Sequence, residues 1–176
     1  MQKPEPIIHG QLVSLRDSRI WPLELLKLRL NNEIERSTEN EADLGFIIFQ
    51  LGKDFTGEPK LIDGFEKIIL EVFRYSDMIY NLAPYYYGVI VPNRRASECL
   101  RLIKRFLQIT ETIFAQKREI YVGYSTRCGR MVNSKRLFKE SLMSVSQAGP
   151  DKKQIIHFKP DLHKYQRLLA ELHNNG

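Results

Sequence analysis

Apolar residues are arranged along the chain in two alternating patterns. Five short runs are nearly continuous in apolar, β-branched or aromatic residues, which is typical of strands with little exposed surface. They cover residues 43–51, 78–82, 85–91, 119–126 and 154–159. The first and third runs contain almost no polar residue, so we expect them to be central strands covered on both faces.

Segments with apolar residues at three- and four-residue spacing lie between these runs and predict amphipathic helices. The expected helices cover residues 18–36, 60–73, 93–117, 133–147 and 160–173. Ser18 is the expected N-cap of the first, with Pro22 in its first turn and Leu23 on its buried face. Helices that alternate with strands predict an α/β fold with helices on the faces of the sheet.

The strands at 78–82 and 85–91 stand close together and predict a β-hairpin, with the break at Ala83-Pro84. Arg74 and Asp77 stand immediately before it, where the second helix gives way to the first strand of the hairpin.

Length and composition fit one domain of 176 residues. We expect a linker at 1–17, the domain at 18–159, and an extra C-terminal helix at 160–176 that packs on it. No apolar run is long enough to span a membrane, and no signal-peptide pattern is present. The net charge of +6 favours anionic partners without specifying which. The two cysteines and four scattered histidines have no metal-ligand spacing.

The hairpin resembles the signature of GGDEF domains, the diguanylate cyclases. That family has Arg-x-x-Asp, five residues, Gly-Gly-Asp/Glu-Glu-Phe, an apolar strand and proline. Here Arg74-Tyr75-Ser76-Asp77 is followed by five residues, then by APYYY at 83–87 and GVIVP at 88–92. The resemblance implies a GGDEF (nucleotide cyclase-like) fold, with a central, mostly antiparallel sheet and helices on its faces.

The same resemblance implies an inactive enzyme. The acidic metal ligands of the family correspond to Gln50, a position near Gly52, and the tyrosines Tyr85 and Tyr86. None of these offers the carboxylate oxygens that Mg²⁺ prefers. Asp54 is the only acid in the loop after the first strand that could mimic a ligand, and one carboxylate does not make a magnesium site. We therefore expect no catalytic residue, no metal ligand and no cofactor.

In the family, Arg-x-x-Asp is the inhibitory site that binds the product, cyclic di-GMP, and a further arginine comes from the next helix. The ungapped count from Ala83 places that arginine at Arg105, with Arg101 one turn earlier. A guanidinium matches the O6 and N7 acceptors of guanine, and a carboxylate accepts from its N1–H and N2–H₂ edge. The predicted ligand-binding residues are Arg74, Asp77, Arg105 and Arg101.

The implied protein is a cytoplasmic, non-catalytic cyclic di-GMP receptor that regulates a process such as exopolysaccharide production, biofilm formation or motility. Such domains often form the C-terminal part of a longer protein. We therefore expect this domain to be the cytoplasmic C-terminal part of a larger, membrane-anchored protein. A second copy of the domain or another protein is expected to close over the ligand. No nucleic-acid polymer and no membrane contact by this segment is expected.

Other interpretations remain open. Arg74 could be an ordinary cation at a helix C-terminus with Asp77 as its surface partner, a pair worth about 0–1 kcal/mol. The domain could be a pseudo-enzyme that docks a protein partner and binds no nucleotide. A basic RNA-binding domain is the third interpretation, against which the lack of an aromatic RNP-type motif argues. The run Tyr85–Tyr87 could stack bases, although strand aromatics more often fill the core.

Overall fold

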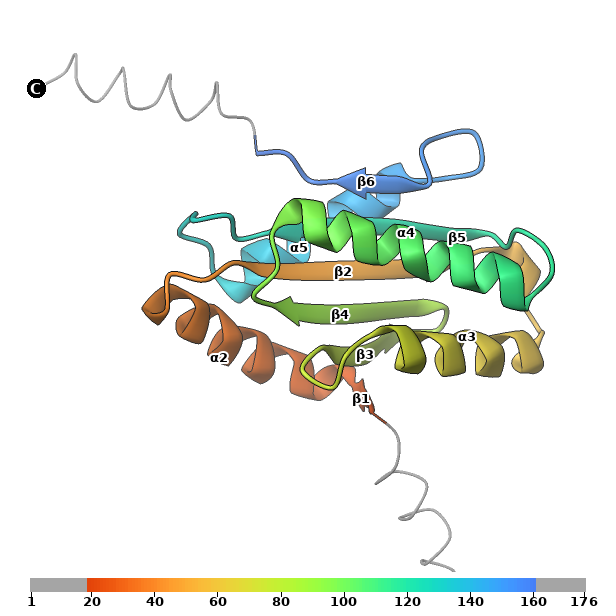
Figure 1. The fold of residues 1–176 in the computed structure, drawn as a ribbon, viewed down its shortest axis with the longest axis horizontal. Helices are drawn as coiled ribbons and strands as arrows, with labels where there is room; N and C mark the ends of the chain where they lie inside the picture. Colours follow the sequence, from red (N-terminus) through yellow and green to blue (C-terminus); the bar gives the residue numbers. More distant parts are fainter. Residues whose placement is uncertain (1–18, 161–176) are drawn as a thin grey trace, which may run out of the picture.

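A computed structural model describes residues 19–160, which form a six-stranded sheet with helices on both faces (Figure 1). The strands are β1 (Ile20–Pro22), β2 (Leu44–Leu51), β3 (Met78–Ala83), β4 (Tyr86–Pro92), β5 (Ile120–Thr126) and β6 (Ile155–His157). The helices are α2 (Leu26–Glu39), α3 (Pro59–Val72), α4 (Ala96–Ile113) and α5 (Ser134–Gln147), with 3₁₀ turns η1 (Leu23–Leu25) and η2 (Lys53–Phe55). Within these described residues, no helix is both long and apolar enough to cross a lipid bilayer.

The strand order is β1-β3-β4-β2-β5-β6. Every neighbouring pair is antiparallel except the two edge pairs, β1 with β3 and β5 with β6, which are parallel. Strand β2 lies between β4 and β5, with Ile47 opposite Val89 on one side and Tyr124 on the other. Its position explains the nearly unbroken apolar run, because both of its faces are covered.

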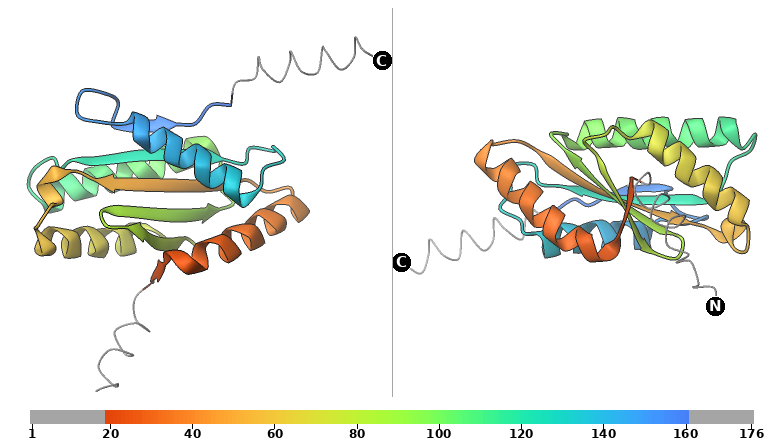
Figure 2. Two further views of the ribbon diagram at one scale, coloured as in Figure 1. Left: turned by 180° about the vertical axis from the view of Figure 1, so that it is seen from behind. Right: turned by 90° about the horizontal axis from the view of Figure 1, so that it is seen from below.

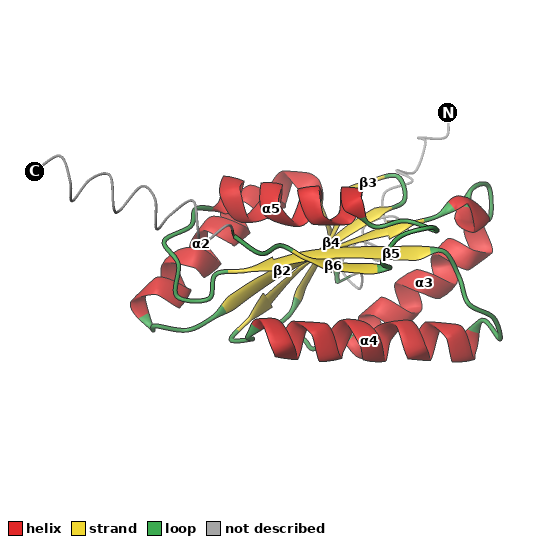
Figure 3. Ribbon diagram, turned by 90° about the horizontal axis from the view of Figure 1, so that it is seen from above, coloured by secondary structure: helices red, strands yellow, loops and turns green. Residues whose placement is uncertain are grey.

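Helices α3 and α4 cover one face of the sheet, and α2 and α5 cover the other (Figures 2 and 3). The larger core lies under α3 and α4 and includes a cluster of phenylalanines, with Phe49 and Phe106 ring centroids 4.9 Å apart. The smaller core lies under α2 and α5. Helix α5 lies flush on β5 because Gly123 has no side chain. A Cβ there would lie 2.0 Å from the backbone nitrogen of Val145.

The region before α2 differs from the predicted helix. Residues Ile20–Pro22 form β1, which adds to the otherwise unpaired edge of β3, and Pro22, which lacks an N–H, ends the strand. Helix α2 begins only at Leu26, so the prediction of Pro22 in a first helical turn was wrong. Leu23, predicted to be buried, is 44% exposed. Ser18 and the predicted helix after Pro160 lie outside the described residues.

The hairpin is confirmed, with Pro84 and Tyr85 as its turn. Tyr85 has a φ of 66°, in the left-handed region where glycine is favoured. Proline followed by a residue of positive φ is the pattern of a type II turn. A tyrosine in this conformation costs roughly 1–2 kcal/mol, because its Cβ crowds the backbone.

Candidate functional site

The sheet has two functionally distinct ends. We call the end where β2 begins and β4 ends the arginine end, because Arg74 and Arg94 lie there (left in Figure 1). We call the opposite end, with the turn at Pro84 and Tyr85, the hairpin end. The predicted ligand site belongs to the arginine end, and the positions that carry catalysis in the resembled family belong to the hairpin end.

Asp77 holds together the loop that joins α3 to β3. Its Oδ2 accepts the backbone N–H of Arg74 at 2.8 Å, and its own backbone N–H donates to the Arg74 carbonyl at 3.0 Å. Arg94, which follows β4, brings Nη2 to 3.4 Å from the same Oδ2. The loop is therefore a tight turn, fixed by one carboxylate that also connects it to the start of α4.

The carboxylate of Asp77 is buried, with 1% of the side chain exposed. Its Oδ1 has no hydrogen-bond partner among the described residues. Burial raises the pKa of Asp77, and the Arg74 N–H and the charges of Arg94 and Arg74 offset this only in part. In this conformation the side chain supports the loop, and a ligand reaches Oδ1 only if neighbouring atoms move.

Arg74 is exposed, and among the described residues its guanidinium makes no hydrogen bond or ion pair. Arg101 and Arg105 are exposed on α4. The ring of Phe73 packs against that of Phe106 with centroids 6.1 Å apart. Phe73 precedes Arg74 and Phe106 follows Arg105, so the loop and the middle of α4 lie against each other.

At the hairpin end, Glu119 occupies the space beside the loop after β2. Gly52 donates its N–H to the Glu119 carbonyl at 2.6 Å, and the Lys53 N–H donates to Glu119 Oε2 at 3.0 Å. A Cβ on Gly52 would lie 2.3 Å from the Cβ of Glu119. Gln50 lies in the sheet opposite Tyr86. A backbone N–H that could hold an anion is thus already bonded to a carboxylate of the chain.

Asp54, the only candidate acid in this loop, is also engaged. Its Oδ2 lies 3.6 Å from Arg118 Nη1 and accepts the Glu119 N–H at 3.3 Å. Within residues 19–160, no three His, Cys, Asp or Glu side chains come close enough together to hold a metal ion. Asp54 and Glu119 are thus two neighbouring carboxylates at the hairpin end, and each is bonded to a group of the chain itself.

The three tyrosines at this end have different environments. Tyr87 is buried, packs on Phe65 with centroids 4.9 Å apart, and donates its hydroxyl to Glu66 Oε1 at 2.6 Å. Burial and the negative charge of Glu66 raise the pKa of Tyr87. The predicted core role is confirmed for Tyr87, whereas Tyr85 and Tyr86 are half-buried.

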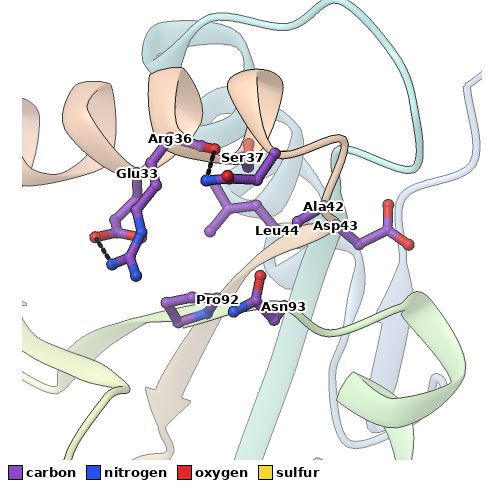
Figure 4. Close-up of a pocket in the computed structure, with 9 residues that line it drawn as sticks. Glu33, Arg36, Ser37, Ala42, Asp43, Leu44, Pro92 and Asn93 are labelled. Atoms are coloured by element: carbon purple, nitrogen blue, oxygen red, sulfur yellow. Dashed lines mark hydrogen bonds and ion pairs between the residues drawn. The ribbon is translucent and has the colours of Figure 1, made fainter.

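A cavity of about 350 Å³ lies between the end of α2 and the end of β4 (Figure 4). Glu33 and Arg36 line it from α2, Asn93 faces them across the opening, and Asp43 lies on the β2 side. Arg36 is already within 3.9 Å of Glu33. Two carboxylates and a single, paired arginine suit a dianionic ligand poorly, so this cavity is a weaker candidate than the Arg74 loop.

An ion-pair cluster with a buried carboxylate and partly exposed arginines joins α5 to the end of β5. The carboxylate of Glu140 accepts from Arg130 at 2.8 and 2.9 Å, from Arg136 Nε at 3.0 Å and from the Ser125 hydroxyl at 2.6 Å. Burial raises the pKa of Glu140, but the hydrogen bonds from Arg130 and Ser125 outweigh it and hold the pKa below its usual value. Ser125 is thus a buried donor within this cluster.

Sequence reasoning missed Arg94 and Glu119. The signal for Arg94 was the hairpin register: Met78 pairs with Ile90, so residues just before β3 and just after β4 must meet. No pattern in the sequence predicted the role of Glu119, because its contact with the loop after β2 joins residues that are 66 positions apart.

Solved structures with similar folds were found, although no protein-family model matches the sequence and no curated protein matches it. The active GGEEF domain of a diguanylate cyclase from Vibrio cholerae has a TM-score of 0.71 at 10% identity, covering 81% of this chain and 99% of that one. The GGDEF domain of DgcB from Caulobacter crescentus, in complex with c-di-GMP, has a TM-score of 0.69 at 9% identity, covering 90% and 97%.

The GGDEF domain of FimX from Pseudomonas aeruginosa is similar too, with a TM-score of 0.64 at 9% identity, covering 78% and 94%. These likenesses confirm the predicted fold class: the chain has the fold of GGDEF domains, with a mostly antiparallel six-stranded sheet.

Proposed function

We propose that this domain is a non-catalytic receptor for cyclic di-GMP, which binds at the arginine end through Arg74, Asp77, Arg105 and Arg101. The observation that carries the proposal is the state of Arg74. Its guanidinium is exposed and unpaired among the described residues, on a rigid turn packed against α4. Two of the similar GGDEF structures, from DgcB, contain c-di-GMP.

The ligand chemistry suits these groups. Guanine presents O6 and N7 as a pair of acceptors, and the planar guanidinium of Arg74 can donate to both. Arg101 and Arg105 lie one turn apart on α4 and supply positive charge for the phosphates. Both are exposed, so binding a dianion does not first require breaking an internal ion pair.

Asp77 has two roles in this proposal. Its Oδ2 fixes the loop through the Arg74 N–H, and its unpartnered Oδ1 is the acceptor for the N1–H and N2–H₂ edge of guanine. Because the side chain is 1% exposed, that second contact forms only when Arg94 or the loop backbone shifts.

The hairpin end supports the non-catalytic part of the proposal. Gln50, Gly52, Tyr85 and Tyr86 stand where the resembled family has its acidic signature, and Glu119 occupies the adjoining loop. Two-metal phosphoryl chemistry needs carboxylates to hold the cations, and these positions supply none.

Calorimetry with cyclic di-GMP, with GTP as the comparison ligand, tests the binding site. A bidentate arginine–guanine contact is worth about 1–3 kcal/mol, so Arg74→Ala should weaken cyclic di-GMP binding at least about tenfold. Arg105→Ala should weaken it by a smaller factor. Arg29→Ala is the matched control, because Arg29 is exposed on α2, on the opposite face of the sheet. Arg94 is unsuitable as a control, because it contacts Asp77.

If the site is specific, Arg74→Ala and Arg105→Ala weaken the binding of cyclic di-GMP, and Arg29→Ala leaves it unchanged. Equal small losses in all three variants, growing at low salt, would mean that a basic surface merely collects a polyanion. Wild-type protein that binds no cyclic di-GMP would refute the receptor function outright.

Turnover is tested separately. Incubation of the protein with GTP and Mg²⁺ or Mn²⁺ should yield no cyclic di-GMP above the blank, because the metal-holding carboxylates are missing. Clear product formation, measured by chromatography, would show that the hairpin end is active after all.

One observation favours a second candidate, a module that docks a protein partner. A groove of about 530 Å³ between α2 and α5 has an apolar floor with charged residues beside it. Its lining residues are Leu23, Leu26, Leu30 and Phe138 together with Glu24, Lys27, Ser134 and Lys135. The absence of cyclic di-GMP binding, together with a folded and monodisperse protein, would favour this function.

A further inference from the structure

Tyr75 is the most exposed of the large apolar side chains in the described part of the chain, at 87%. It lies in the loop between Arg74 and Asp77. The loop is well ordered by hydrogen bonds: the Phe73 N–H donates to the Ile69 carbonyl at the end of α3, and Arg74 and Asp77 are joined by two further bonds. A rigid turn therefore holds an aromatic ring out in solvent, where it contributes little to the core.

Arg19 backs this ring. Its guanidinium carbon lies 5.1 Å from the centroid of the Tyr75 ring, and its Nη2 donates a hydrogen bond to the Leu70 carbonyl in the last turn of α3. Ile20, the next residue, is paired with Ile79 in the parallel β1–β3 ladder. Arg19 is thus held by its side chain and by its neighbour in the ladder, and it places a positive charge over one face of the ring while most of the ring stays exposed.

The second face of the ring is open to solvent, as the 87% exposure requires. A ring with a cation on one face and water on the other resembles the platforms on which proteins stack nucleobases. Arg74 is the adjacent residue and has a free guanidinium, which can address the edge of the same base. Face and edge of one purine can then be bound from two consecutive residues.

We propose that Tyr75, backed by Arg19, is a stacking platform for a guanine base of cyclic di-GMP. This inference rests on the receptor function proposed above and adds two residues to that site. A base bound in this way would lie beside the beginning of β1, because Arg19 immediately precedes that strand.

The experiment is calorimetry of cyclic di-GMP with four variants and the wild type. Base–aromatic stacking leads us to expect that Tyr75→Ala loses about 5- to 100-fold in affinity, whereas Tyr75→Phe, which keeps the ring, stays within about twofold of the wild type. Arg19→Ala should lose about two- to fivefold. Met131→Ala is the control, since Met131 is 83% exposed and lies in the segment between β5 and α5.

A direct readout accompanies the affinities. The ring protons of Tyr75 should shift upfield in NMR spectra when cyclic di-GMP is added, through the ring current of a stacked guanine. Circular dichroism verifies that each variant is folded, which the exposure of Tyr75 leads us to expect.

The outcomes separate the two hypotheses. Binding that depends on Arg74 but is unchanged in Tyr75→Ala would overturn the platform and leave the receptor function standing. An equal loss in Tyr75→Phe and Tyr75→Ala would show that the hydroxyl, and not the ring, makes the contact, and would also overturn it. Wild-type protein that does not bind cyclic di-GMP would overturn both.

Discussion

The two ends of the sheet differ in whether all of their charged side chains have partners. At the hairpin end, both nearby acids are engaged: Asp54 pairs with Arg118, and Glu119 bonds the backbone after β2. At the arginine end, Asp77 and Glu140 hold Arg94 and Arg130, but Arg74 is left exposed and without a partner among the described residues.

This difference bears on function because a binding site needs groups that are fixed yet unsatisfied. The backbone of Arg74 is fixed by Asp77, while its side chain has no internal partner. At the hairpin end, Glu119 already satisfies the Lys53 N–H that a phosphate could use. Among the described residues, Arg74 at one end of the sheet thus has an exposed and unpaired side chain, whereas at the other end a carboxylate of the protein already bonds the Lys53 N–H.

The largest effect is expected from the Glu140 cluster, which anchors α5 at the arginine end. Glu140→Ala removes the buried carboxylate that Arg130 and Arg136 contact. Removing one partner of a fully buried ion pair costs about 3–5 kcal/mol, and we expect about 3 kcal/mol in free energy of unfolding here, because the two arginine side chains are 20% and 41% exposed. Urea denaturation measures this. Glu140→Gln should lose less, because it keeps the side-chain volume and an acceptor for Ser125.

The pH dependence sharpens this prediction. The folded pKa of Glu140 lies below the ordinary value of 4.5, so its stabilisation is complete above that value and is lost as the pH falls through the folded pKa. The difference between wild type and Glu140→Gln should therefore shrink in acid. A constant difference from pH 7 to pH 3 would contradict the ionised cluster.

A smaller effect is expected at Asp77. Asp77→Ala leaves the Arg74 N–H without its acceptor and should cost about 1–3 kcal/mol. Asp77→Asn can keep this hydrogen bond and also removes the cost of burying a charge, so it should be as stable as the wild type or more so at neutral pH. Thermal unfolding compares the two.

At Asp77, the stability of the protein depends on pH with the opposite sign from that at Glu140. The folded pKa of Asp77 is raised above 3.8, so the cost of its charge is absent below that value and complete above the folded pKa. The stability of Asp77→Asn relative to wild type should rise with pH through this interval. The opposite trend would show that Arg94 stabilises the carboxylate more than burial destabilises it.

The smallest effect is expected at Glu119, which is exposed. Glu119→Ala removes the acceptor of the Lys53 N–H and should lower the free energy of unfolding by less than about 1 kcal/mol, because water replaces it. It should yield no GTP turnover, since no carboxylate is gained. A drop of several kcal/mol would show that Glu119 holds the hairpin end together.

Most of the fold was predictable, because its central strands are buried on both faces and their sequences are almost entirely apolar. β2 and β4 were found on this basis. The helix predicted at residues 133–147 is confirmed as α5, and the Asn133 side chain caps it by accepting the Arg136 N–H. β1 was not predicted, because an edge strand of three residues is too short to show a periodic pattern. Pro22 and the leucines that follow it fit a helix equally well.

The candidate site was predictable only in part. The positions of Arg74 and Asp77 relative to the hairpin followed from local sequence. The contact between Phe73 and Phe106, which brings their loop against α4, did not. The burial of Asp77 could not be predicted from the sequence, because it depends on the contact with Arg94, which follows the second strand of the hairpin. The stacking of Arg19 on Tyr75 depends on the unexpected β1.

The close packing of α5 on β5 limits how the sequence of this protein can vary. At the hairpin turn, alanine, proline and tyrosine stand where the resembled family has glycines and acids, and the chain still folds. At Gly123 no such freedom exists, because the Val145 nitrogen and the Ser141 carbonyl occupy the place of any side chain. In a library of all single substitutions selected for folding, we expect position 123 to accept glycine alone, while positions 83–86 accept many residues.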